Sequence, residues 1–370
     1  MDLFFYGTLC HVPLLEIVLG RPAKEISMEP AQLQDHRVAQ VISQSFPMIL
    51  HQTGSTAFGL LVRDLSETDY AKLRYYEGGF DYTVRDMSVA TEAGASASAW
   101  VFFPSAGRWT PGEPWHLDIW AAEWGAMTEL AAIEVMAHHK RLGPEDVGRN
   151  LPAMRLRAAA RLAARARPAD GTRSVSDDVV LHRHHRGYLN FFSFDDVDVQ
   201  YRQHDGSMGP VVNRGVLLTG RAAVVLPYDP VLDTVLLVEQ FRVGAYMIDD
   251  PAPWIWEAVA GMVDPGETPE QAARREAIEE AGIHLAALEP AGEAFSSTGS
   301  STEYVHLYVG ITDLSDVPET GGLAEEGEDI RSQKFSFDEL MHMLDSQQLR
   351  ALPLVSLANW LARHRDRLRR

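Results

Sequence analysis

The stretch that decides the fold of the C-terminal half runs from Gly261 to Ile283 and reads GMVDPGETPEQAARREAIEEAGI. Thr268 is a good N-cap, a proline follows it at the first helical position, and Gln271 stands three residues after the cap, as a capping box requires. Gly282 suits the position just past a helix end, where φ is often positive. The pattern therefore predicts a glycine-containing loop that leads into a short helix ending before Gly282.

The predicted helix carries carboxylates on one face. Glu276 and Glu280 are four residues apart, so their side chains share a face and repel each other when both are ionised. A cation between them converts that repulsion into binding energy, and hard oxygen ligands suit Mg²⁺ or Mn²⁺. A solvated acidic face is the ordinary alternative for a Glu-rich helix, and only the full spacing of the stretch favours a metal site.

That spacing matches the signature of the Nudix hydrolases at every fixed position. The matching residues are Gly261, Glu267, Arg275, Glu276, Glu279, Glu280, Gly282 and Ile283. Ala277 is smaller than the aliphatic residue common at its place. The resemblance implies an α/β/α architecture, a mixed sheet sandwiched by helices, and the apolar runs 221–227 and 234–241 are typical of paired strands in such a sheet.

Outside the signature, residues 178–366 are similar in order to the ADP-ribose pyrophosphatase branch of this family, including the enzymes associated with tellurite resistance. The segments that carry the likeness are 186–187, 190–193, 238–246, 257–261, 297–303 and 323–330. The resemblance implies Mg²⁺-dependent cleavage of ADP-ribose to AMP and ribose 5-phosphate. It also implies a homodimer, because related enzymes exchange their N-terminal strands between subunits.

The resemblance assigns roles to individual residues. It implies metal ligation by Glu276, Glu280, Glu328 and the backbone carbonyl of Ala260, with Glu326 as the general base. Glu267, Arg275 and Glu279 are expected to brace the loop and the helix. The expected substrate-binding residues are Phe191, Arg214, Arg242, Met262, Ser297, Gly299 and Glu303. Thr298 and Asn213 depart from the common pattern and put the fine substrate preference in doubt.

The N-terminal part, residues 1–115, alternates short strand-like runs with turns and helical patterns, which predicts a small α+β domain. The loop Tyr6, Gly7, Thr8, Leu9 and the segment 76–78 resemble the gamma-glutamylcyclotransferase-like family over about residues 1–110. The resemblance implies a small barrel with helices, a loop that binds a substrate carboxylate through backbone N–H groups, and Glu77 as acid and base. The alternative is that these residues only shape a turn at a strand end.

Residues 116–177 are expected to form a helical segment and a linker between the first domain and a Nudix domain at 178–370. The run 153–167 has strong helix propensity and stops at Pro168, before a polar stretch. Its arginines allow a DNA-binding helix. An exposed or interdomain helix is favoured over that reading, because the charge of the whole chain opposes nucleic-acid binding.

The composition of the chain limits the binding partners, the disulfides and the cellular compartment that we expect. The 370 residues hold 33 basic and 52 acidic side chains, a formal charge of −19, which argues against nucleic acid and anionic membranes as partners. The single cysteine excludes an internal disulfide. With neither a basic leader nor a long apolar run, we expect a cytoplasmic protein. The open alternatives are another nucleotide-sugar pyrophosphohydrolase, a non-catalytic ADP-ribose sensor, and a chain whose principal enzyme is the N-terminal domain.

Overall fold

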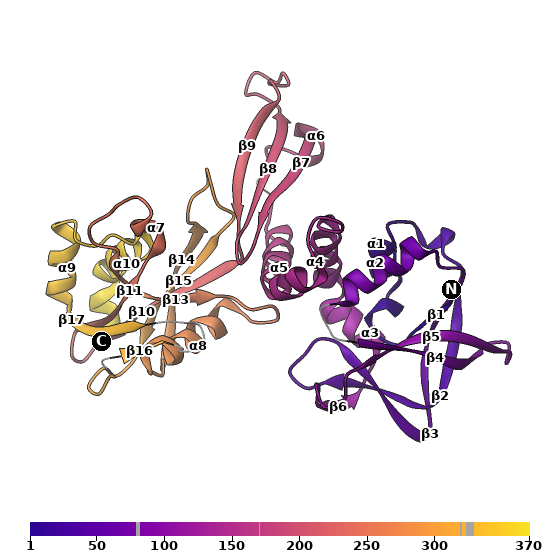
Figure 1. Ribbon diagram of the computed structural model, residues 1–370. Helices are drawn as coiled ribbons and strands as arrows, with labels where there is room; N and C mark the ends of the chain where they lie inside the picture. Colours follow the sequence, from indigo (N-terminus) through magenta and orange to yellow (C-terminus); the bar gives the residue numbers. More distant parts are fainter. Residues whose placement is uncertain (79–81, 170, 319, 323–328) are drawn as a thin grey trace. The chain divides into compact units, whose positions relative to one another are not determined.

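The computed structural model describes residues 1–78, 82–169, 171–318, 320–322 and 329–370. The chain divides into two compact units, Met1–Arg167 and Pro168–Arg370 (Figure 1). The expected catalytic Glu326 and metal ligand Glu328 lie outside the described residues. None of the described helices is long and apolar enough to cross a membrane.

The first unit is built on a five-stranded barrel. Its strands are β1 (Leu3–Phe5), β2 (Met28–Val41), β3 (Pro47–Val62), β4 (Tyr82–Thr91) and β5 (Ser96–Pro104). They follow the order β3-β1-β5-β4-β2, and pairing of β2 with β3 closes the ring, while β6 (Pro111–Pro114) pairs with β2 outside it. The expected small barrel with helices is confirmed.

Alternation along β1 separates two cores. Phe4 packs with the residues inside the barrel, whereas Leu3 and Phe5 pack against the helices outside it. This is the two-residue period of a strand with apolar groups on both faces. Gly59 on β3 permits the close crossing of β1, because a Cβ there would lie 2.0 Å from the Phe5 carbonyl oxygen.

Helices cover one side of this barrel. They are α1 (Val12–Leu19), α2 (Glu67–Glu77), α3 (Leu117–Trp120), α4 (Ala126–Ala137) and α5 (Pro144–Arg165), with a π-helical turn at Ala121–Gly125 and short 3-10 turns at Thr8–Cys10 and Ala23–Glu25. Helices α4 and α5 pack through Met127, Leu130, Ala131 and Ala158. A buried ion pair also joins them, because Arg157 donates to both carboxylate oxygens of Glu134, at 2.6 Å from Nη2 to Oε1 and 3.3 Å from Nε to Oε2.

The expectation that residues 153–167 form an exposed or interdomain helix is wrong for one face of it. Ala153, Met154 and Arg157 are buried, and the whole of α5 belongs to the first unit. The physical reason is that small and apolar residues recur at helical spacing, so that Ala158 packs against α4 on the same face as Met154. Residues 116–167 therefore extend the first unit, whereas the sequence suggested a separate helical segment and linker over 116–177.

The second unit holds a mixed sheet. Its strands are β10 (Arg221–Asp229), β11 (Thr234–Phe241), β12 (Trp254–Glu257), β13 (Val259–Met262), β14 (Ala287–Phe295), β15 (Tyr304–Ile311), β16 (Thr320–Gly321) and β17 (Ile330–Ser336). The main order is β14-β15-β10-β11-β17-β16, with β12 on β11 and β13 on β10. Among the described strands of this sheet, only β10 and β15 pair in parallel.

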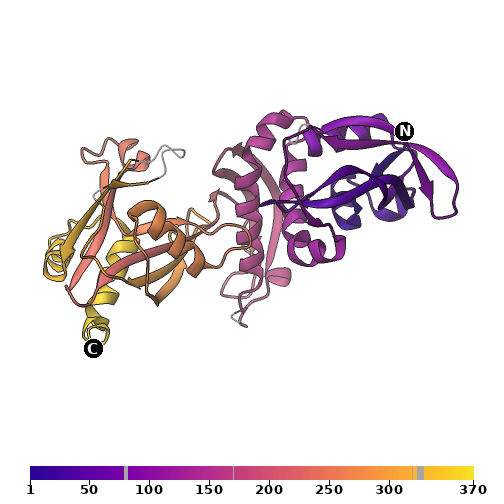
Figure 2. The same cartoon turned by 90° about the horizontal axis from the view of Figure 1, so that it is seen from below.

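Both faces of this sheet are covered by helices. On β10, Ala223 and Val225 face α8 (Pro269–Ala281), and the intervening Val224 and Leu226 face α9 (Phe337–Asp345) and α10 (Leu352–Leu368). Apolar side chains on both faces of a strand indicate a sheet buried on both sides. The α/β/α sandwich is therefore confirmed, and Figure 2 gives a second view of it. A single turn, α7 (Val243–Tyr246), follows β11.

A separate three-stranded sheet precedes the mixed sheet in the second unit. It consists of β7 (Val179–Leu189), β8 (Ser193–Tyr201) and β9 (Val212–Leu218), after the short α6 (Val175–Asp178). Hydrogen bonds from Leu217 N–H to the Ser300 carbonyl (2.8 Å) and from Thr302 N–H to the Leu217 carbonyl (3.0 Å) connect it to the loop before β15. Large apolar side chains remain exposed on it: Leu181, Tyr188, Phe191, Phe192, Phe194 and Tyr201.

Candidate active sites

Helix α8 begins and ends as its sequence predicts. The Gln271 N–H donates to Thr268 Oγ1 at 3.2 Å and the Thr268 N–H donates to Gln271 Oε1 at 2.8 Å, which forms the expected capping box. Gly282 has φ of 64° and terminates the helix in the left-handed conformation. Four alanines of α8 (Ala272, Ala273, Ala277, Ala281) are fully buried against the sheet. The small Ala277 thus lets the helix approach the strands closely.

Arg275 is the centre of a network of charged groups on this helix. Its Nη1 lies 2.5 Å from Glu276 Oε1 and 2.8 Å from Glu279 Oε2, and its Nη2 lies 3.0 Å from Glu267 Oε2. Nη2 also donates to the Met262 carbonyl at 2.9 Å. One guanidinium therefore ties the loop, the helix and the end of β13 together. Its charge offsets part of the repulsion among three carboxylates.

The carboxylates of Glu276 and Glu280 are buried beneath β13. The Ala260 N–H donates to Glu280 Oε2 at 3.0 Å, and Gln240 Nε2 lies 3.4 Å from Glu280 Oε1. A Cβ at Gly261 would lie 1.7 Å from Glu276 Oε1, so this carboxylate occupies space that only glycine leaves open. The structure thus brings the predicted Ala260, Glu276 and Glu280 together in one place.

This donor set fits a hard divalent cation. Two buried carboxylates and a strand backbone supply oxygen ligands only, and that chemistry matches Mg²⁺ or Mn²⁺. Within the part of the chain that the structure describes, no group of three or more His, Cys, Asp or Glu side chains could hold a metal ion. The third predicted carboxylate ligand, Glu328, lies outside that part.

Two predicted substrate-binding residues adjoin the network. Arg242, just after β11, donates from Nε to Glu257 Oε2 at 2.8 Å, and this pair fixes its guanidinium beside β12. Met262 is the last residue of β13, and its carbonyl accepts a hydrogen bond from Arg275 Nη2. Arg242 therefore lies between β11 and α7, and Met262 lies at the end of β13, which pairs with β10.

The remaining predicted residues lie in two other places of the second unit. Ser297, Gly299 and Glu303 share the exposed loop between β14 and β15, where Ser297 Oγ lies 2.9 Å from Ser300 Oγ and the Glu303 carbonyl accepts from the Ser296 N–H at 3.1 Å. Phe191, 50% exposed, lies in the turn between β7 and β8, and Arg214 is exposed on β9. Within one chain the structure does not bring Phe191 and Arg214 to the carboxylates of α8.

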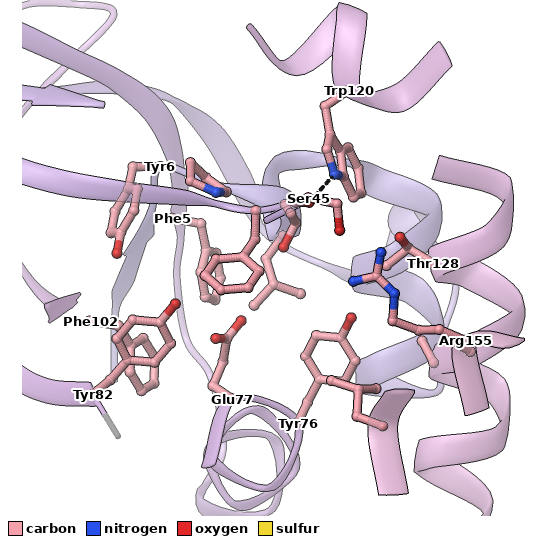
Figure 3. A pocket seen from close by; sticks show the side chains of 18 of the residues that line it. Phe5, Tyr6, Ser45, Tyr76, Glu77, Tyr82, Phe102, Trp120, Thr128 and Arg155 are labelled. Carbon is pink, nitrogen blue, oxygen red and sulfur yellow. Dashed lines mark hydrogen bonds between the residues drawn. The ribbon is translucent and has the colours of Figure 1, made fainter. Parts of the chain in front are cut away.

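A second candidate site is a pocket of about 80 Å³ in the first unit (Figure 3). The loop after β1, the end of α2 and the facing sides of α4 and α5 line it. The lining includes the predicted Tyr6, Gly7, Thr8, Leu9 and Glu77. All five predicted residues of this domain therefore surround one cavity.

The Glu77 carboxyl is the chemically unusual group of this pocket. Burial raises the pKa of Glu77 to about 7. Burial also raises the pKa of Tyr6, Tyr76 and Tyr82 well above the usual range, with the Glu77 charge adding to the effect. The three phenols are therefore neutral at physiological pH. Glu77 titrates in the range where a carboxyl can both accept and donate a proton.

The loop after β1 presents backbone donors to this pocket. Its internal hydrogen bonds run from Cys10 N–H to the Gly7 carbonyl and from His11 N–H to the Thr8 carbonyl, both at 3.0 Å. The N–H groups of Gly7, Thr8 and Leu9 have no protein acceptor among the described residues. A Cβ at Gly7 would lie 2.9 Å from Pro47 Cγ, so glycine is needed for this approach. Successive unpaired N–H groups can bind an anion.

Several residues that line these two sites were not predicted from the sequence. They are Ser45, Tyr82, Trp120, Thr128 and Arg155 in the pocket, and Gln240 beside Glu280. Arg155 and Leu151 are four residues apart on α5 and both face the pocket. That spacing was the one available signal for Arg155, because its arginine-rich surroundings point to solvent.

Two family models match this chain, and each matched segment lies within one of the two units. The model described as "NUDIX domain" matches residues 218–355, and the model described as "Gamma-glutamyl cyclotransferase, AIG2-like" matches residues 3–124.

Individual proteins match the second unit. The chain is similar to a protein of Escherichia coli (strain K12) named ADP-ribose pyrophosphatase, with 36% identity over 193 residues, 52% of this chain and 92% of that protein. It is 30% identical to a GDP-mannose pyrophosphatase of Escherichia coli O1:K1 / APEC over 174 residues, 46% of this chain and 88% of that protein. A solved structure titled "Crystal structure of ADP compounds hydrolase" matches at 19% identity and a TM-score of 0.42, over 52% of this chain and 97% of that one.

The raised pKa of Glu77 predicts a pH-dependent cost to stability. The unfolded carboxyl titrates near 4.5 and the folded one near 7, so the contribution of Glu77 is fully present below about pH 4.5 and is lost as pH rises through 7. Glu77→Gln should therefore stabilise the first unit at pH 8, by at most about 3 kcal/mol because solvent in the open pocket reduces the effect. At pH 4 the two proteins should unfold alike.

Urea unfolding followed by tryptophan fluorescence at both pH values measures this difference. Glu92→Gln, at an exposed turn between β4 and β5, is the matched control and should change neither curve by more than about 0.5 kcal/mol. An equal effect of Glu77→Gln at pH 4 and pH 8 would contradict the burial argument.

Proposed function

Since the chain belongs to the Nudix family, we propose that its second unit hydrolyses the diphosphate of ADP-ribose to AMP and ribose 5-phosphate. The observation that carries the proposal is the pair of buried carboxylates, Glu276 and Glu280, held against the backbone of β13 by Arg275, Ala260 and Gly261. A helix surface that only faces solvent does not require buried acids or a glycine opposite them. The similarity to an ADP-ribose pyrophosphatase over 92% of its length supports the choice of substrate.

The metal would be Mg²⁺ or Mn²⁺, held by Glu276, Glu280, the Ala260 carbonyl and Glu328. When bound, such a cation neutralises diphosphate charge and lowers the pKa of a coordinated water. The residues of the chain do the rest. Arg275 keeps the Glu276 carboxylate in place, and we assign Glu326 the role of the base that takes a proton from the attacking water.

The proposed substrate contacts come from several elements. Arg242 and Arg214 would bind the phosphates and the terminal ribose, because a planar guanidinium can donate two parallel bonds to phosphate oxygens. Phe191 would stack on adenine, and the other contacts are assigned to Met262, Ser297, Gly299 and Glu303. Glu267 and Glu279 touch Arg275 and would act by positioning it.

Glu280→Gln tests the hydrolytic assignment. The substitution removes a buried carboxylate charge while keeping its shape, so AMP release from ADP-ribose with Mg²⁺ should fall by ~100-fold or more. Glu289→Gln, which breaks only the exposed pair between β14 and Arg367, should leave the rate unchanged. Chromatographic detection of AMP measures both variants.

Unchanged AMP release by Glu280→Gln would refute the assignment, and binding of ADP-ribose without turnover by the unaltered chain would identify a sensor. The same assay with GDP-mannose decides the substrate. Faster turnover of GDP-mannose than of ADP-ribose would move the proposal to that substrate, because GDP-mannose pyrophosphatases also match the chain, at 30% and 35% identity.

We further propose that the second unit works as a homodimer. Phe191 and Arg214 lie on a three-stranded sheet, away from the α8 carboxylates of the same chain, and that sheet exposes large apolar side chains. A second copy would cover this surface and bring its own Phe191 and Arg214 to the site. Exposed apolar patches of this kind mark interfaces.

Leu181→Asp on β7 should weaken the dimer, because a charge would enter the interface. Val231→Asp, in the exposed turn after β10, serves as its control and should not. Size-exclusion chromatography with light scattering gives the masses. A monomeric unaltered chain at micromolar concentration would refute the dimer.

A second candidate function belongs to the first unit. The buried Glu77, whose pKa is raised to about 7, faces a pocket with unpaired backbone donors at the loop after β1. We propose that this pocket binds a γ-glutamyl compound and releases 5-oxoproline. The α-amine would attack the γ-carbonyl carbon and the γ-amide bond would break. Glu77 would take the proton from the attacking amine and return it to the leaving amine.

Glu77→Gln should reduce 5-oxoproline release by ~100-fold, because the amide cannot transfer the proton. The rate of the unaltered chain should rise with pH around 7, as the carboxyl ionises to act as base. Release of 5-oxoproline is measured chromatographically with a γ-glutamyl dipeptide as substrate. Failure of the unaltered chain to release it would remove this function and leave the pyrophosphohydrolase proposal intact.

A further inference from the structure

One wall of the pocket in the first unit is formed by helices that follow the matched family segment. The cyclotransferase model ends at residue 124, whereas α4 and α5 begin at Ala126 and Pro144. Thr128, Ala131 and Ala132 line the pocket from one face of α4, at the helical spacing of three and four residues. Leu151 and Arg155 line it from one face of α5. This wall therefore consists of residues that follow the matched segment.

Arg155 is the cation of that wall. Figure 3 shows its guanidinium reaching toward Ser45 and the Tyr76 hydroxyl, with Thr128 beside it. The guanidinium also lies near an aromatic ring, since Arg155 Cζ is 5.6 Å from the centre of the Trp124 ring. No carboxylate among the described residues forms an ion pair with it.

Two other arginines of α5, unlike Arg155, form ion pairs with carboxylates. Arg157 is paired with the buried Glu134, at 2.6 Å, and Arg149 with the exposed Asp146, at 3.0 Å. The pairing of Arg157 also fixes α5 on α4, so the position of Arg155 two residues away is set by the fold. A partly buried guanidinium that has hydroxyl and aromatic neighbours, but no carboxylate partner among the described residues, carries a desolvation cost that no ion pair offsets.

Glu77 does not serve as the partner of Arg155. The structure records no ion pair between them, and the pKa of Glu77 stays raised by burial without an opposing effect of the guanidinium. The two groups therefore face different parts of the same cavity. One part of the cavity is lined by Glu77 and the loop after β1. The other part is lined by Arg155, together with Ser45, Tyr76 and Thr128.

We propose that Arg155 binds a second carboxylate of the ligand, on the part of the molecule that departs as the amine. The preferred ligands are thus γ-glutamyl compounds whose amine portion is itself an acid, in preference to neutral γ-glutamyl amides. The inference rests on the proposed γ-glutamyl binding in this pocket and deepens it. A carboxylate is planar and accepts two parallel bonds from a guanidinium, and the small Ala131 and Ala132 leave room for it on α4.

The experiment compares two probes of nearly equal size, γ-glutamylglycine and its neutral amide γ-glutamylglycinamide, by titration calorimetry on the full chain. The unaltered chain should bind the acid roughly 10-fold to 100-fold more tightly than the amide. Arg155→Ala should abolish that preference with little change for the amide, and Arg155→Lys should retain part of it. Arg149→Ala, on the exposed face of α5, should behave as the unaltered chain.

Each outcome bears on the inference in one direction. Equal affinity of the unaltered chain for the two probes, a preference that survives in Arg155→Ala, or no binding of either probe would overturn it. Unfolding curves of Arg155→Ala that match the unaltered chain exclude loss of the fold as the cause of lost preference. A purely structural arginine would lower affinity for both probes together, which also overturns it.

Release of 5-oxoproline separates this inference from the function on which it rests. If the preference for the acid depends on Arg155 but neither probe is turned over, the cyclotransferase activity fails and the carboxylate site stands. If both probes are turned over with equal kcat/KM in the unaltered chain, the activity stands and the role of Arg155 is refuted.

Discussion

The second unit depends on how closely α8 approaches the sheet. Ala272, Ala273, Ala277 and Ala281 are fully buried, and the carboxylate of Glu276 fills the space that a Cβ on Gly261 would need. Larger residues on either side would move the helix outward and take the acids away from β13. Small residues in the core therefore serve the site directly, since they set the distance between a helix that carries charge and a strand that carries backbone donors and acceptors.

The two units bury carboxylates in different ways. In the second unit, Arg275 binds Glu267, Glu276 and Glu279 at once, so the acids are held next to a fixed positive charge. In the first unit, Glu77 has no such partner among the described residues, and burial raises its pKa to about 7. A carboxylate that must remain ionised to hold a cation suits the first environment, and a carboxyl that must exchange a proton near neutral pH suits the second.

Much of the second unit could be predicted because its signals are local. The cap at Thr268, the end at Gly282 and the shared face of Glu276 and Glu280 depend only on residues within one helix. The strands β10 and β11 are apolar on both faces, and that pattern already indicates helices on both sides of the sheet. In the first unit, the barrel and the loop after β1 were predicted only from the resemblance to a known family. No periodicity in residues 1–115 shows that β2 returns to β3 and closes the ring.

The pocket wall could not be predicted, and the reason is physical. The run 153–167 is rich in both alanine and arginine, a composition that is equally compatible with an exposed helix and with one that lies against another small-residue face. Only the tertiary partner decides, because α4 brings Glu134 to Arg157 and leaves Arg155 turned toward the cavity. The net charge of the chain is a sum over 370 residues, and such a sum does not show where one guanidinium is held. Arg155 is a candidate for ligand recognition because it lies in the pocket beside hydroxyl groups, whereas Arg157, two residues along the helix, is already paired with Glu134.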